Sequence, residues 1–504
     1  MLLDAQVGNL IEPLSGRRWD RHKIGQEVLR RVAHYYDRGM RPRDRVFLLH
    51  GNQIEFFADL LAVWILGGCA VPIDARLTPF EVGTLQQAAQ PKFAISCESS
   101  DHALAGSLAE SKVPVLSTEA VRQSASLTRP LNNGLFLDSD ALILFTSGTT
   151  GQPKGVVHTH RSLRARWMGL RQTLDMREFR RTLCLLPTHF GHGLICNCLF
   201  PWLSGQDLFI VPPFKTDFVM QLGSLLDEHR ITFMSSVPTV WRMALKMTKP
   251  PRRQPLERVF CGSAPLTAFL WKEIQRWTGT SNVCNAYGIT ETGSWAAGTT
   301  VPNLVPEDGL IGVGWGSVIK ILPSSIAEEP ARPCAPGESG FVWLDTPALM
   351  RGYLDRDDLT HQVVQQGWFM TGDIGSLDER GYLYLRGRER EEINKGGTKI
   401  YPGDIDAVVE RFEGTVDVCT FAFEDPLYGQ NVGLAVVLTD TRDETVRALY
   451  DWMARHIAKH QMPARWYFLE QMPRSSRGKI NRAQVAQRCE GLSPVQLHRI
   501  VGLQ

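Results

Sequence analysis

The chain has 504 residues, of which 43% are hydrophobic and 21% are charged, and its formal net charge at pH 7 is +2. This composition is typical of a globular protein with a large core, and the length alone predicts about three domains. Because positive and negative charges nearly cancel, we expect no general attraction to nucleic acid or to acidic membranes. Chemistry on a small molecule agrees better with this balance.

The cysteines and the apolar segments bear on the compartment. Ten cysteines are scattered without a paired framework, and Asp4 lies where a signal peptide would have its basic region. We therefore expect a reducing cytoplasm. The most apolar run, 56–73, contains Asp59, two glycines and Pro72. Since a spanning helix needs roughly 20 apolar residues, we expect no membrane span.

The first part of the chain alternates between helical and strand-like patterns. Ile24, Val28 and Val32 recur at helical spacing, and Asp20 before them can cap the helix. A strand, a helix and a strand follow, which predicts a β-α-β unit with parallel strands buried on both faces. These elements, with one further strand, are expected at 45–49, 54–66, 69–73 and 93–95.

The alternation continues beyond Thr146, where the next predicted strand ends. It predicts a layered α/β architecture with functional sites at the C-terminal ends of strands. After Gly298, shorter β-like runs at 318–322, 340–344 and 382–385 predict an antiparallel subdomain. Helices are expected at 162–174, 218–228, 240–247 and 268–277, and strands at 182–186, 231–234, 258–261 and 282–286.

A charged stretch at 387–392 is typical of an exposed linker. Beyond it the pattern predicts a compact α+β unit. We therefore place a domain boundary at Arg390, between a large N-terminal domain of layered α/β sheets with a β-rich subdomain (1–389) and a small, mobile α+β domain (390–504). Within the small domain, helices are expected at 404–412 and 446–457, and strands at 417–423 and 432–438.

A stretch rich in glycines and hydroxyl side chains follows the apolar run at 142–145. Its glycines permit tight turns in which backbone N–H groups point at an anion, while the hydroxyls add donors and Lys154 a charge. We expect this anion to be a phosphate. The spacing excludes a Walker P-loop, because Lys154 follows Pro153 and precedes Gly155. The stretch reads Thr146, Ser147, Gly148, Thr149, Thr150, Gly151, Gln152, Pro153, Lys154 and Gly155.

Three chemical groups lie together at the end of the strand predicted at 282–286. Tyr287 offers an aromatic face, Thr290 a hydroxyl and Glu291 a carboxylate. These are the groups that stack on a base, contact a phosphate and bind Mg²⁺. Taken alone, the segment would be better interpreted as a plain turn at the end of a strand.

The glycine- and hydroxyl-rich stretch closely resembles the phosphate-binding signature of the adenylate-forming superfamily, which includes acyl-CoA synthetases, carrier-protein adenylation domains and beetle luciferases. Further motifs follow in the family's order, so the resemblance covers essentially the whole chain. It implies that Tyr287 packs on adenine beside Gly288, that Thr290 meets the α-phosphate and that Glu291 binds Mg²⁺. The remaining nucleotide contacts that it implies are Thr146, Ser147, Gly148, Thr149, Thr150, Gly151 and Lys154 for the phosphates, Gly262, Ser263 and Ala264 for adenine, and Asp373 and Arg388 for the ribose.

The resemblance also implies a catalytic loop in the C-terminal domain. Lys479 would bridge the attacking carboxylate and the α-phosphate, which neutralises the charge that builds up as pyrophosphate leaves. Arg390 falls at the family's hinge position, where relatives often carry Asp or Lys. After rotation of the domain, Gly396 and Gly397 would line the tunnel for the thiol acceptor.

A pocket for the acid is expected around 185–193, which resembles the family's acyl-pocket motif and contains His192. Many relatives have histidine where this chain has Phe190. Phe190, Trp295 and Trp241 could narrow or floor the pocket, although each could also be core. They favour a medium-chain or aromatic carboxylate.

Two other patterns are rejected. The glycines at 312–316 hint at a dinucleotide fingerprint, but a strand-like run follows instead of a helix. His189, His192, Cys196 and Cys198 have a spacing that suggests zinc, but a buried pocket wall is the better interpretation.

The resemblance thus predicts an enzyme that uses ATP and Mg²⁺ to activate a carboxylic acid and transfers the acyl group to coenzyme A. An alternative is a ligase that loads the phosphopantetheine of a carrier protein. A different class of interpretation is a catalytically silent nucleotide-binding protein, against which Lys154, Glu291, Asp373 and Lys479 argue.

Overall fold

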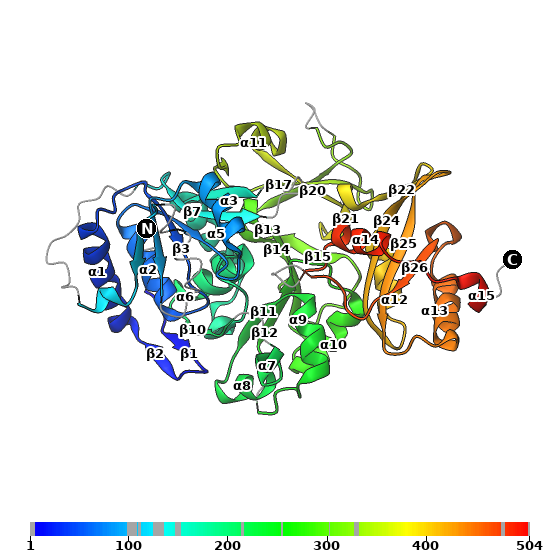
Figure 1. Ribbon diagram of the computed structural model, residues 1–504, viewed down its shortest axis with the longest axis horizontal. Coiled ribbons are helices and arrows are strands. Elements are labelled where there is room, and N and C mark those ends of the chain that lie inside the picture. Colours follow the sequence, from blue (N-terminus) through cyan, green and yellow to red (C-terminus); the bar gives the residue numbers. More distant parts are fainter. Residues whose placement is uncertain are drawn as a thin grey trace.

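A computed structural model describes residues 6–97, 108, 112–123, 136–146, 153–212, 216–253, 256–301, 303–326, 332–474 and 479–501. Within these residues the strands form three sheets that follow one another along the long axis of the molecule (Figure 1). Both the large and the seven-stranded sheet belong to the N-terminal part of the chain, whereas the third sheet contains only residues after Ile393. The fold is therefore the mixed α/β type that the sequence predicts.

The seven-stranded sheet carries the strand that leads into the glycine- and hydroxyl-rich stretch. Its central strands β3, β4 and β7 run parallel, as predicted for a β-α-β unit. In spatial order the sheet consists of β18 (Gly352–Tyr353), β8 (Lys154–Thr159), β7 (Asp140–Thr146), β4 (Cys69–Pro72), β3 (Arg45–Leu48), β5 (Phe93–Ser96) and β6 (Val115–Ser117).

Strand β8 was not predicted from the sequence. It begins at Lys154 and pairs antiparallel with β7, so that Thr146 and Lys154 lie opposite each other. Val156 and Val157 are completely buried, which explains why this short segment becomes a strand between the stretch and the helix that follows.

The large sheet changes from parallel to antiparallel pairing in its middle. Strands β9 to β13 pair parallel, whereas β13 reverses into β14 and the strands beyond are antiparallel. The order is β16 (Val318–Leu322), β17 (Gly340–Asp345), β20 (Trp368–Leu377), β21 (Leu383–Arg388), β15 (Leu310–Gly314), β14 (Ser294–Gly298), β13 (Val283–Ile289), β12 (Arg258–Gly262), β11 (Phe233–Ser236), β9 (Arg181–Cys184), β10 (Asp207–Ile210), β1 (Leu10–Glu12) and β2 (Arg17–Trp19), with β19 (Val364–Gln365) beside β20.

The antiparallel strands predicted beyond Gly298 are observed, and β14 and β15 join them to the parallel strands in one sheet. One other prediction for this part needs correction. The predicted helix at 218–228 is two helices, α7 (Thr216–Val219) and α8 (Leu222–Glu228). Gly223 lies near the break and is a poor helix former, and a Cβ atom there would lie 2.0 Å from the Lys249 carbonyl oxygen.

Helices cover these sheets and close one extended core. Asp20 caps α1 as predicted, since its side chain accepts a hydrogen bond from the backbone N–H of Lys23. The remaining helices of this part are α1 (Arg21–Asp37), α2 (Ile54–Ile65), α3 (Pro79–Ala89), α5 (His160–Thr173), the π-helix η4 (His192–Leu199), α6 (Phe200–Trp202), α9 (Pro238–Met247), α10 (Ala268–Thr278) and α11 (Asp357–Val363), with 3₁₀ turns η2 (Ala120–Gln123), η3 (Met176–Phe179), η5 (Thr290–Thr292) and η6 (Glu389–Glu391).

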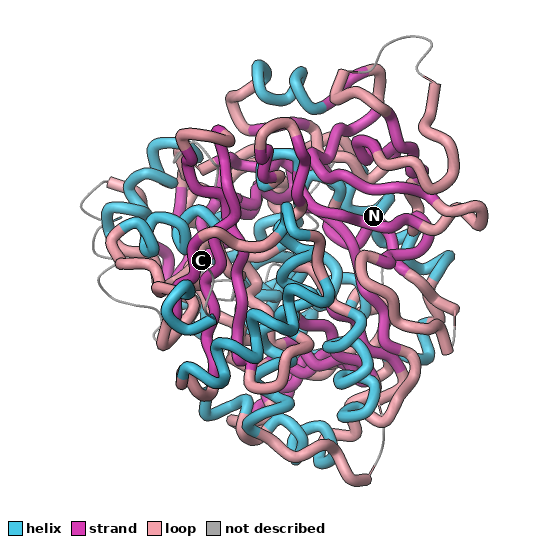
Figure 2. Tube along the Cα trace, turned by 90° about the vertical axis from the view of Figure 1, so that its right-hand side faces the viewer, coloured by secondary structure: helices cyan, strands magenta, loops and turns pink. Residues whose placement is uncertain are grey.

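The third sheet has helices packed over its strands, as the view onto the C-terminal part shows (Figure 2). Its strands are β23 (Thr398–Ile400), β22 (Ile393–Lys395), β25 (Gly429–Leu438) and β24 (Thr415–Asp425), with β26 (Arg465–Phe468) beside β25. Its helices are α12 (Pro402–Glu410), α13 (Asp443–His456), η7 (Lys459–Gln461), α14 (Arg482–Glu490) and α15 (Leu497–Val501). None of the helices that the structure describes combines the length and hydropathy of a membrane span.

Candidate active site

The turn η5 lies where the large sheet changes from parallel to antiparallel pairing. Strand β13 ends at Ile289, and Thr290 and Glu291 follow it directly. A Cβ atom on Gly288 would lie only 1.8 Å from the Ser294 carbonyl oxygen, so this reversal requires glycine. The sheet therefore presents a hydroxyl and a carboxylate at its C-terminal edge, as predicted.

Tyr287, Asp373 and Arg388 form a connected group beside this turn. The Tyr287 hydroxyl donates to Asp373 Oδ2 at 2.5 Å, and Arg388 Nε lies 2.9 Å from Asp373 Oδ1. Burial and the Asp373 carboxylate raise the pKa of Tyr287 well above its ordinary value, and Asp373 also raises the pKa of Arg388. The predicted ribose contacts and the predicted adenine-stacking residue are thus brought together.

The segment around Asp373 belongs to a long strand. Thr371, Gly372 and Asp373 lie within strand β20, and Asp373 is the cross-strand partner of Arg388 on β21. Register across two antiparallel strands therefore places the carboxylate against the guanidinium.

Glu291 and Lys154 meet at Tyr353, a residue that the sequence analysis did not single out. The Tyr353 hydroxyl donates to Glu291 Oε1 at 2.8 Å, and Lys154 Nζ lies 5.4 Å from the centroid of the Tyr353 ring. Thr146 lies opposite Lys154 on β7. The other predicted phosphate contacts, Ser147, Gly148, Thr149, Thr150 and Gly151, lie outside the described residues.

The donor set fits a magnesium ion that arrives with a nucleotide. Glu291 offers carboxylate oxygen, the ligand type that Mg²⁺ prefers, and Mg²⁺ usually binds through one or two carboxylates together with substrate phosphates. No group of three or more His, Cys, Asp or Glu side chains among the described residues is arranged to hold a metal ion.

The predicted adenine segment begins at the end of β12. A Cβ atom on Gly262 would lie 2.2 Å from the Ala286 carbonyl oxygen, so the neighbouring strand itself requires glycine there. Ser263 has a φ of 66°, in the left-handed region. Its hydroxyl bonds His192 Nδ1 at 2.9 Å, and Ala264 follows it, half-buried. The segment thus links the strand end to the predicted acid pocket.

His192 belongs to the segment that is predicted to form that pocket. Its Nε2 atom bonds the Ser235 hydroxyl at 2.6 Å, so both ring nitrogens are engaged by serine hydroxyls. Burial, assisted by the nearby Lys479 ammonium, lowers the pKa of His192 to about 3. The imidazole is therefore neutral at pH 7, which makes it a hydrogen-bonding wall and not a cation.

The aromatic candidates fall into two groups. Phe190 and Trp295 both contact His192, with ring centroids 5.9 and 5.7 Å away. Trp295 continues into the core, where its ring lies 4.8 Å from that of Phe260. Trp241 instead packs against Trp277. Phe190, His192 and Trp295 thus form one aromatic wall.

Lys479 reaches this wall from the other end of the chain. Its Nζ atom lies 5.4 Å from the centroid of the Phe190 ring. The segment before α14 runs from the third sheet toward the centre of the molecule (Figure 1). The predicted catalytic lysine is therefore in the same site as the predicted acid pocket.

The predicted hinge and thiol-tunnel residues lie outside this cluster. Arg390 is exposed in η6, which connects β21 to β22. Gly396 and Gly397 form the exposed tip of the β22–β23 hairpin, and their φ angles of 57° and 88° suit a two-residue turn. Arg390 is two residues beyond Arg388, and partial burial together with the nearby Arg388 charge lowers the pKa of its guanidinium. The structure therefore places the hinge candidate next to the ribose candidates, whereas Gly396 and Gly397 make no contact with them that the described residues show.

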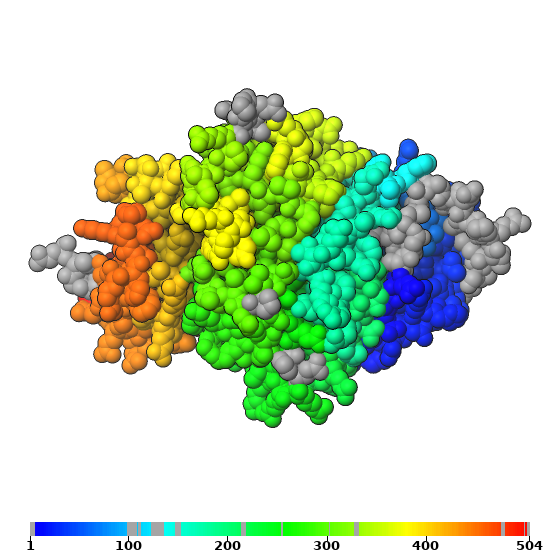
Figure 3. All heavy atoms as spheres, turned by 180° about the vertical axis from the view of Figure 1, so that it is seen from behind, coloured from blue at the N-terminus to red at the C-terminus, as the bar shows by residue number. Residues whose placement is uncertain are grey.

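Polar contacts connect the third sheet's helix α12 to the large sheet's helices. Arg242 on α9 lies 2.6 Å from Glu410 Oε1, and the Thr267 hydroxyl donates to Glu410 Oε2 at 2.5 Å. Arg411 pairs with Asp308. In the space-filling view the yellow and orange residues of the C-terminal part meet the green residues along one continuous boundary (Figure 3). A boundary made of ion pairs can separate without exposing a hydrophobic core.

Two further residues contact η5 and were missed. His158 Nε2 bonds the Thr290 carbonyl oxygen at 2.8 Å, and Arg166 Nη2 donates to the Thr292 carbonyl oxygen at 2.7 Å. Arg166 is three residues after Leu163 and four before Leu170, so it shares their apolar helix face, and this charge on an apolar face was the available signal. Tyr353 had no comparable signal.

The sequence matches two family models. A model described as AMP-binding enzyme matches residues 24–354, and one described as AMP-binding enzyme C-terminal domain matches residues 404–479. The long-chain-fatty-acid–CoA ligase FadD13 of Mycobacterium tuberculosis (strain ATCC 25618 / H37Rv) is 29% identical over 88% of this chain and 87% of its own length. Feruloyl-CoA synthase of an Amycolatopsis species is 28% identical over 92% and 93%, respectively.

Solved structures share the fold. ATP-bound MatB from Rhodopseudomonas palustris matches with a TM-score of 0.82 at 24% identity, covering 97% of both chains. The same protein without ligand matches with a TM-score of 0.72 at 23% identity, covering 97% of this chain and 98% of its own. Both matches show that the fold is shared.

Proposed function

The chain belongs to the AMP-binding enzyme family, and we propose that it is an AMP-forming ligase that joins a carboxylic acid to the thiol of coenzyme A through an acyl-adenylate. The observation that carries this proposal is the position of Lys479 beside Phe190 and His192. A cation from the C-terminal part then lies against the residues expected to form the acid pocket.

In the first half-reaction an acid oxygen forms a bond to the α-phosphorus of ATP, and the bond from that phosphorus to the bridging oxygen breaks to release pyrophosphate. We assign Lys479 to bridge the acid and the α-phosphate, and Thr290 to donate to the same phosphate. Asp373 and Arg388 bind the ribose, and Tyr287 packs on adenine. Their contacts with one another support this assignment.

Glu291 would hold Mg²⁺, which when bound neutralises phosphate charge. Tyr353 orients the Glu291 carboxylate, and Lys154 approaches from β8 to contact the phosphates. The loop of Ser147, Gly148, Thr149, Thr150 and Gly151 completes the phosphate contacts, with Thr146 at its start.

In the second half-reaction the thiol sulfur attacks the acyl carbon, its proton is lost, and AMP leaves. We propose that residues 390–504 rotate about Arg390 as one domain, which withdraws Lys479 and presents Gly396 and Gly397 to the thiol. A sheet built only from residues after Ile393 and the ion-paired boundary support this motion.

For the acid we propose a medium-chain or aromatic carboxylate. The aromatic wall of Phe190, His192 and Trp295 supports this choice, because ring faces pack well against flat or apolar substrates. We also propose a cytoplasmic location, in keeping with the scattered cysteines.

The test is pyrophosphate release with ATP and Mg²⁺ across short, medium, long-chain and aryl acids, each with and without coenzyme A. The proposal expects release that rises with a medium-chain or aryl acid and yields its coenzyme A thioester. If adenylate stays bound when coenzyme A is added, the thiol acceptor would instead be the phosphopantetheine of a carrier protein. If no acid causes pyrophosphate release, the chain would be a catalytically silent nucleotide-binding protein.

A further inference from the structure

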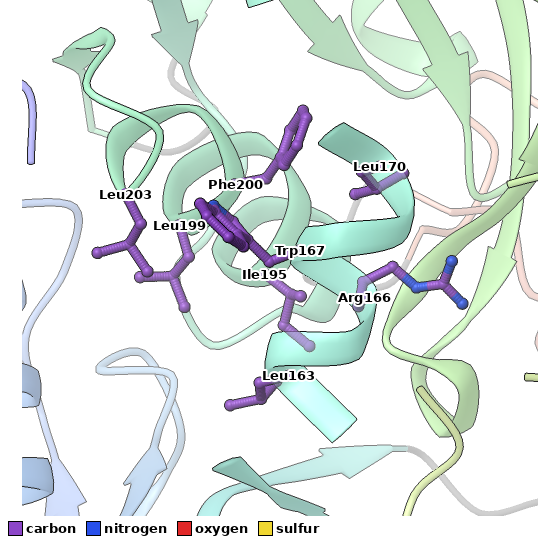
Figure 4. Close-up of a pocket in the computed structure, with 8 residues that line it drawn as sticks. All are labelled: Leu163, Arg166, Trp167, Leu170, Ile195, Leu199, Phe200 and Leu203. Atoms are coloured by element: carbon purple, nitrogen blue, oxygen red, sulfur yellow. The ribbon is translucent and has the colours of Figure 1, made fainter. Parts of the chain in front are cut away.

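Arg166 is the most deeply buried charge next to the candidate site. Its side chain is 1% exposed in helix α5. Its stem lines a small apolar hollow with Leu163 and Trp167, whereas its guanidinium points away from that hollow, toward the strands of the large sheet (Figure 4). The hollow is small, with a volume of about 10 Å³. The buried guanidinium, and not the hollow, therefore requires a functional explanation.

The N–H groups of the guanidinium donate hydrogen bonds to carbonyl and hydroxyl oxygens. Nε and Nη2 donate to the Thr292 carbonyl oxygen at 3.1 and 2.7 Å, and Nη1 donates to the Trp315 carbonyl oxygen at 2.5 Å. Nη2 also reaches the hydroxyls of Ser317 and Thr346 at 3.3 and 3.4 Å. None of these bonds within the described residues involves a carboxylate. Burying a charge without a counter-ion costs several kcal/mol, so a merely space-filling role would favour an apolar side chain.

The bond to Thr292 is one of two that fix the turn η5 to the same segment. His158, which immediately precedes α5's N-cap residue, bonds the Thr290 carbonyl oxygen, and its Nδ1 atom bonds the Ser162 hydroxyl at 3.1 Å. Carbonyl groups on both sides of Glu291 are therefore held by side chains from β8 and α5. The same strand β8 begins with Lys154.

The glycine-rich run at 312–316 serves this arrangement. A Cβ atom on Gly169 of α5 would lie 3.1 Å from Gly316 Cα, and Gly316 has a φ of 61°. The two glycines let α5 approach closely enough for Arg166 to reach the Trp315 carbonyl oxygen. This run is thus a packing element that helps to seat the guanidinium, which agrees with its rejection as a dinucleotide fingerprint.

We propose that Arg166 is a positioning residue for the adenylation half-reaction: by holding the Thr292 carbonyl oxygen it fixes the turn that directs the Thr290 hydroxyl and the Glu291 carboxylate toward Mg·ATP. This inference rests on the proposed function for the identity of the nucleotide. Arg166 acts through Thr290 and Glu291 and requires no contact of its own with the substrate.

The experiment compares Arg166→Met, which keeps the stem but removes the donors, with Arg166→Lys, which keeps the charge and one strong donor. Arg258→Met is the matched control, because Arg258 is also buried but pairs with Glu178 at the far end of β12. Calorimetry measures Mg·ATP binding, pyrophosphate exchange measures the KM values for Mg·ATP and for the acid, and hydrogen exchange follows the segment 288–294.

For Arg166→Met we expect Mg·ATP binding and exchange rate to fall about 10- to 100-fold, as for other residues that orient a ligand from behind. The KM for the acid is expected to stay unchanged, hydrogen exchange to quicken at 288–294, and Arg166→Lys to recover most of the loss. Arg258→Met is expected to change none of these readouts, even if it lowers the melting temperature.

Unchanged Mg·ATP affinity in folded Arg166→Met, or equal losses with Arg258→Met, would overturn the proposal. If the Met variant does not fold, Arg166→Gln decides, because this neutral and shorter side chain cannot reach the Thr292 and Trp315 carbonyl oxygens together. Mg·ATP affinity and hydrogen exchange at 288–294 that both equal the wild type would then contradict the proposal. If the wild type exchanges pyrophosphate with no acid, the proposed ligase function is contradicted. Mg·ATP binding and hydrogen exchange would still test the role of Arg166 in that case.

Discussion

The Lys479 ammonium lies over the ring of Phe190, with 5.4 Å between Nζ and the ring centroid. Lys479 comes from the loop before α14, and Phe190 comes from the segment before η4. The contact therefore joins the C-terminal part of the chain to the N-terminal part. It exists only while the C-terminal part is seated on the large sheet. The pair therefore marks the arrangement in which we expect adenylate to form.

Replacing Phe190 by Leu should slow adenylate formation. Leu keeps most of the volume but removes the ring face, and a cation–π contact is worth about 0.5 to 2 kcal/mol, which corresponds to roughly 2- to 30-fold in rate. The measurement is acid-dependent pyrophosphate exchange. Phe80→Leu serves as the control, because Phe80 is 84% exposed. Equal rates for both variants and the wild type would show that the ring face is irrelevant.

The pair Arg242–Glu410 should favour adenylate formation over thioester formation. Arg242→Met, Glu410→Met and the double variant form a cycle, and we expect a coupling energy of about 1 to 3 kcal/mol in the adenylation rate. The coupling should vanish for thioester formation from supplied adenylate, since that step requires the boundary to open.

The exposed pair Arg442–Asp440 supplies the control cycle for this boundary. It lies within the C-terminal part and should show no coupling in either half-reaction, as is common for surface pairs. Identical coupling in both half-reactions for Arg242–Glu410 would mean that the pair stabilises the fold and does not select a domain arrangement.

Asp373→Asn should weaken ATP binding and erase discrimination against 2′-deoxy-ATP. The carboxylate accepts from Tyr287 and Arg388, and a hydrogen bond to a charged group is worth about 1.5 to 3 kcal/mol, or roughly 10- to 150-fold in KM. The check is the ratio of kcat/KM for ATP and 2′-deoxy-ATP in wild type and variant. An unchanged ratio would remove Asp373 from the ribose site.

His160 should make the fold sensitive to acid. Burial lowers its pKa from an ordinary value of 6.5 to about 4. Between these values the unfolded chain binds a proton at this residue and the folded chain does not, so stability falls as the pH falls from 6.5 toward 4. At pH 5 the contribution lost is about 2 kcal/mol.

His160→Phe should remove this contribution, because Phe keeps the edge contact that the imidazole makes with Trp64. Urea unfolding at pH 8, 7, 6 and 5 should show a variant that equals the wild type at neutral pH and exceeds it at pH 5 by about 2 kcal/mol. The exposed His22→Asn should leave the profile as it is. Parallel profiles for His160→Phe and wild type would contradict the assignment.

Much of the fold could be predicted because local patterns determine it. Helix α1 begins at the cap that Asp20 provides, and the β3-α2-β4 unit is parallel as its continuous apolar runs indicate. Strand β8 was missed because only Val156 and Val157 of its six residues are apolar, which is too few to show the period of a strand.

The site itself could be predicted only in part. Separate motifs identified Glu291, Asp373 and Lys479 as candidates. The residues next to Tyr353 and Arg166 in the sequence, in contrast, do not indicate that these two side chains contact a turn far away in the chain. Tyr353 approaches Glu291 through the pairing of β18 with β8, and Arg166 reaches Thr292 through helix packing. Such contacts follow from tertiary structure and not from sequence period.

The most direct test of the account measures the two half-reactions separately in wild type and Lys479→Ala, with Lys459→Ala as an exposed control. We expect Lys479→Ala to lose about 100-fold or more in adenylate formation, the loss typical of removing one transition-state donor, and to form thioester from supplied adenylate at the wild-type rate. An equal loss in both half-reactions, or none in the first, would contradict the assignment of Lys479 to the adenylation step.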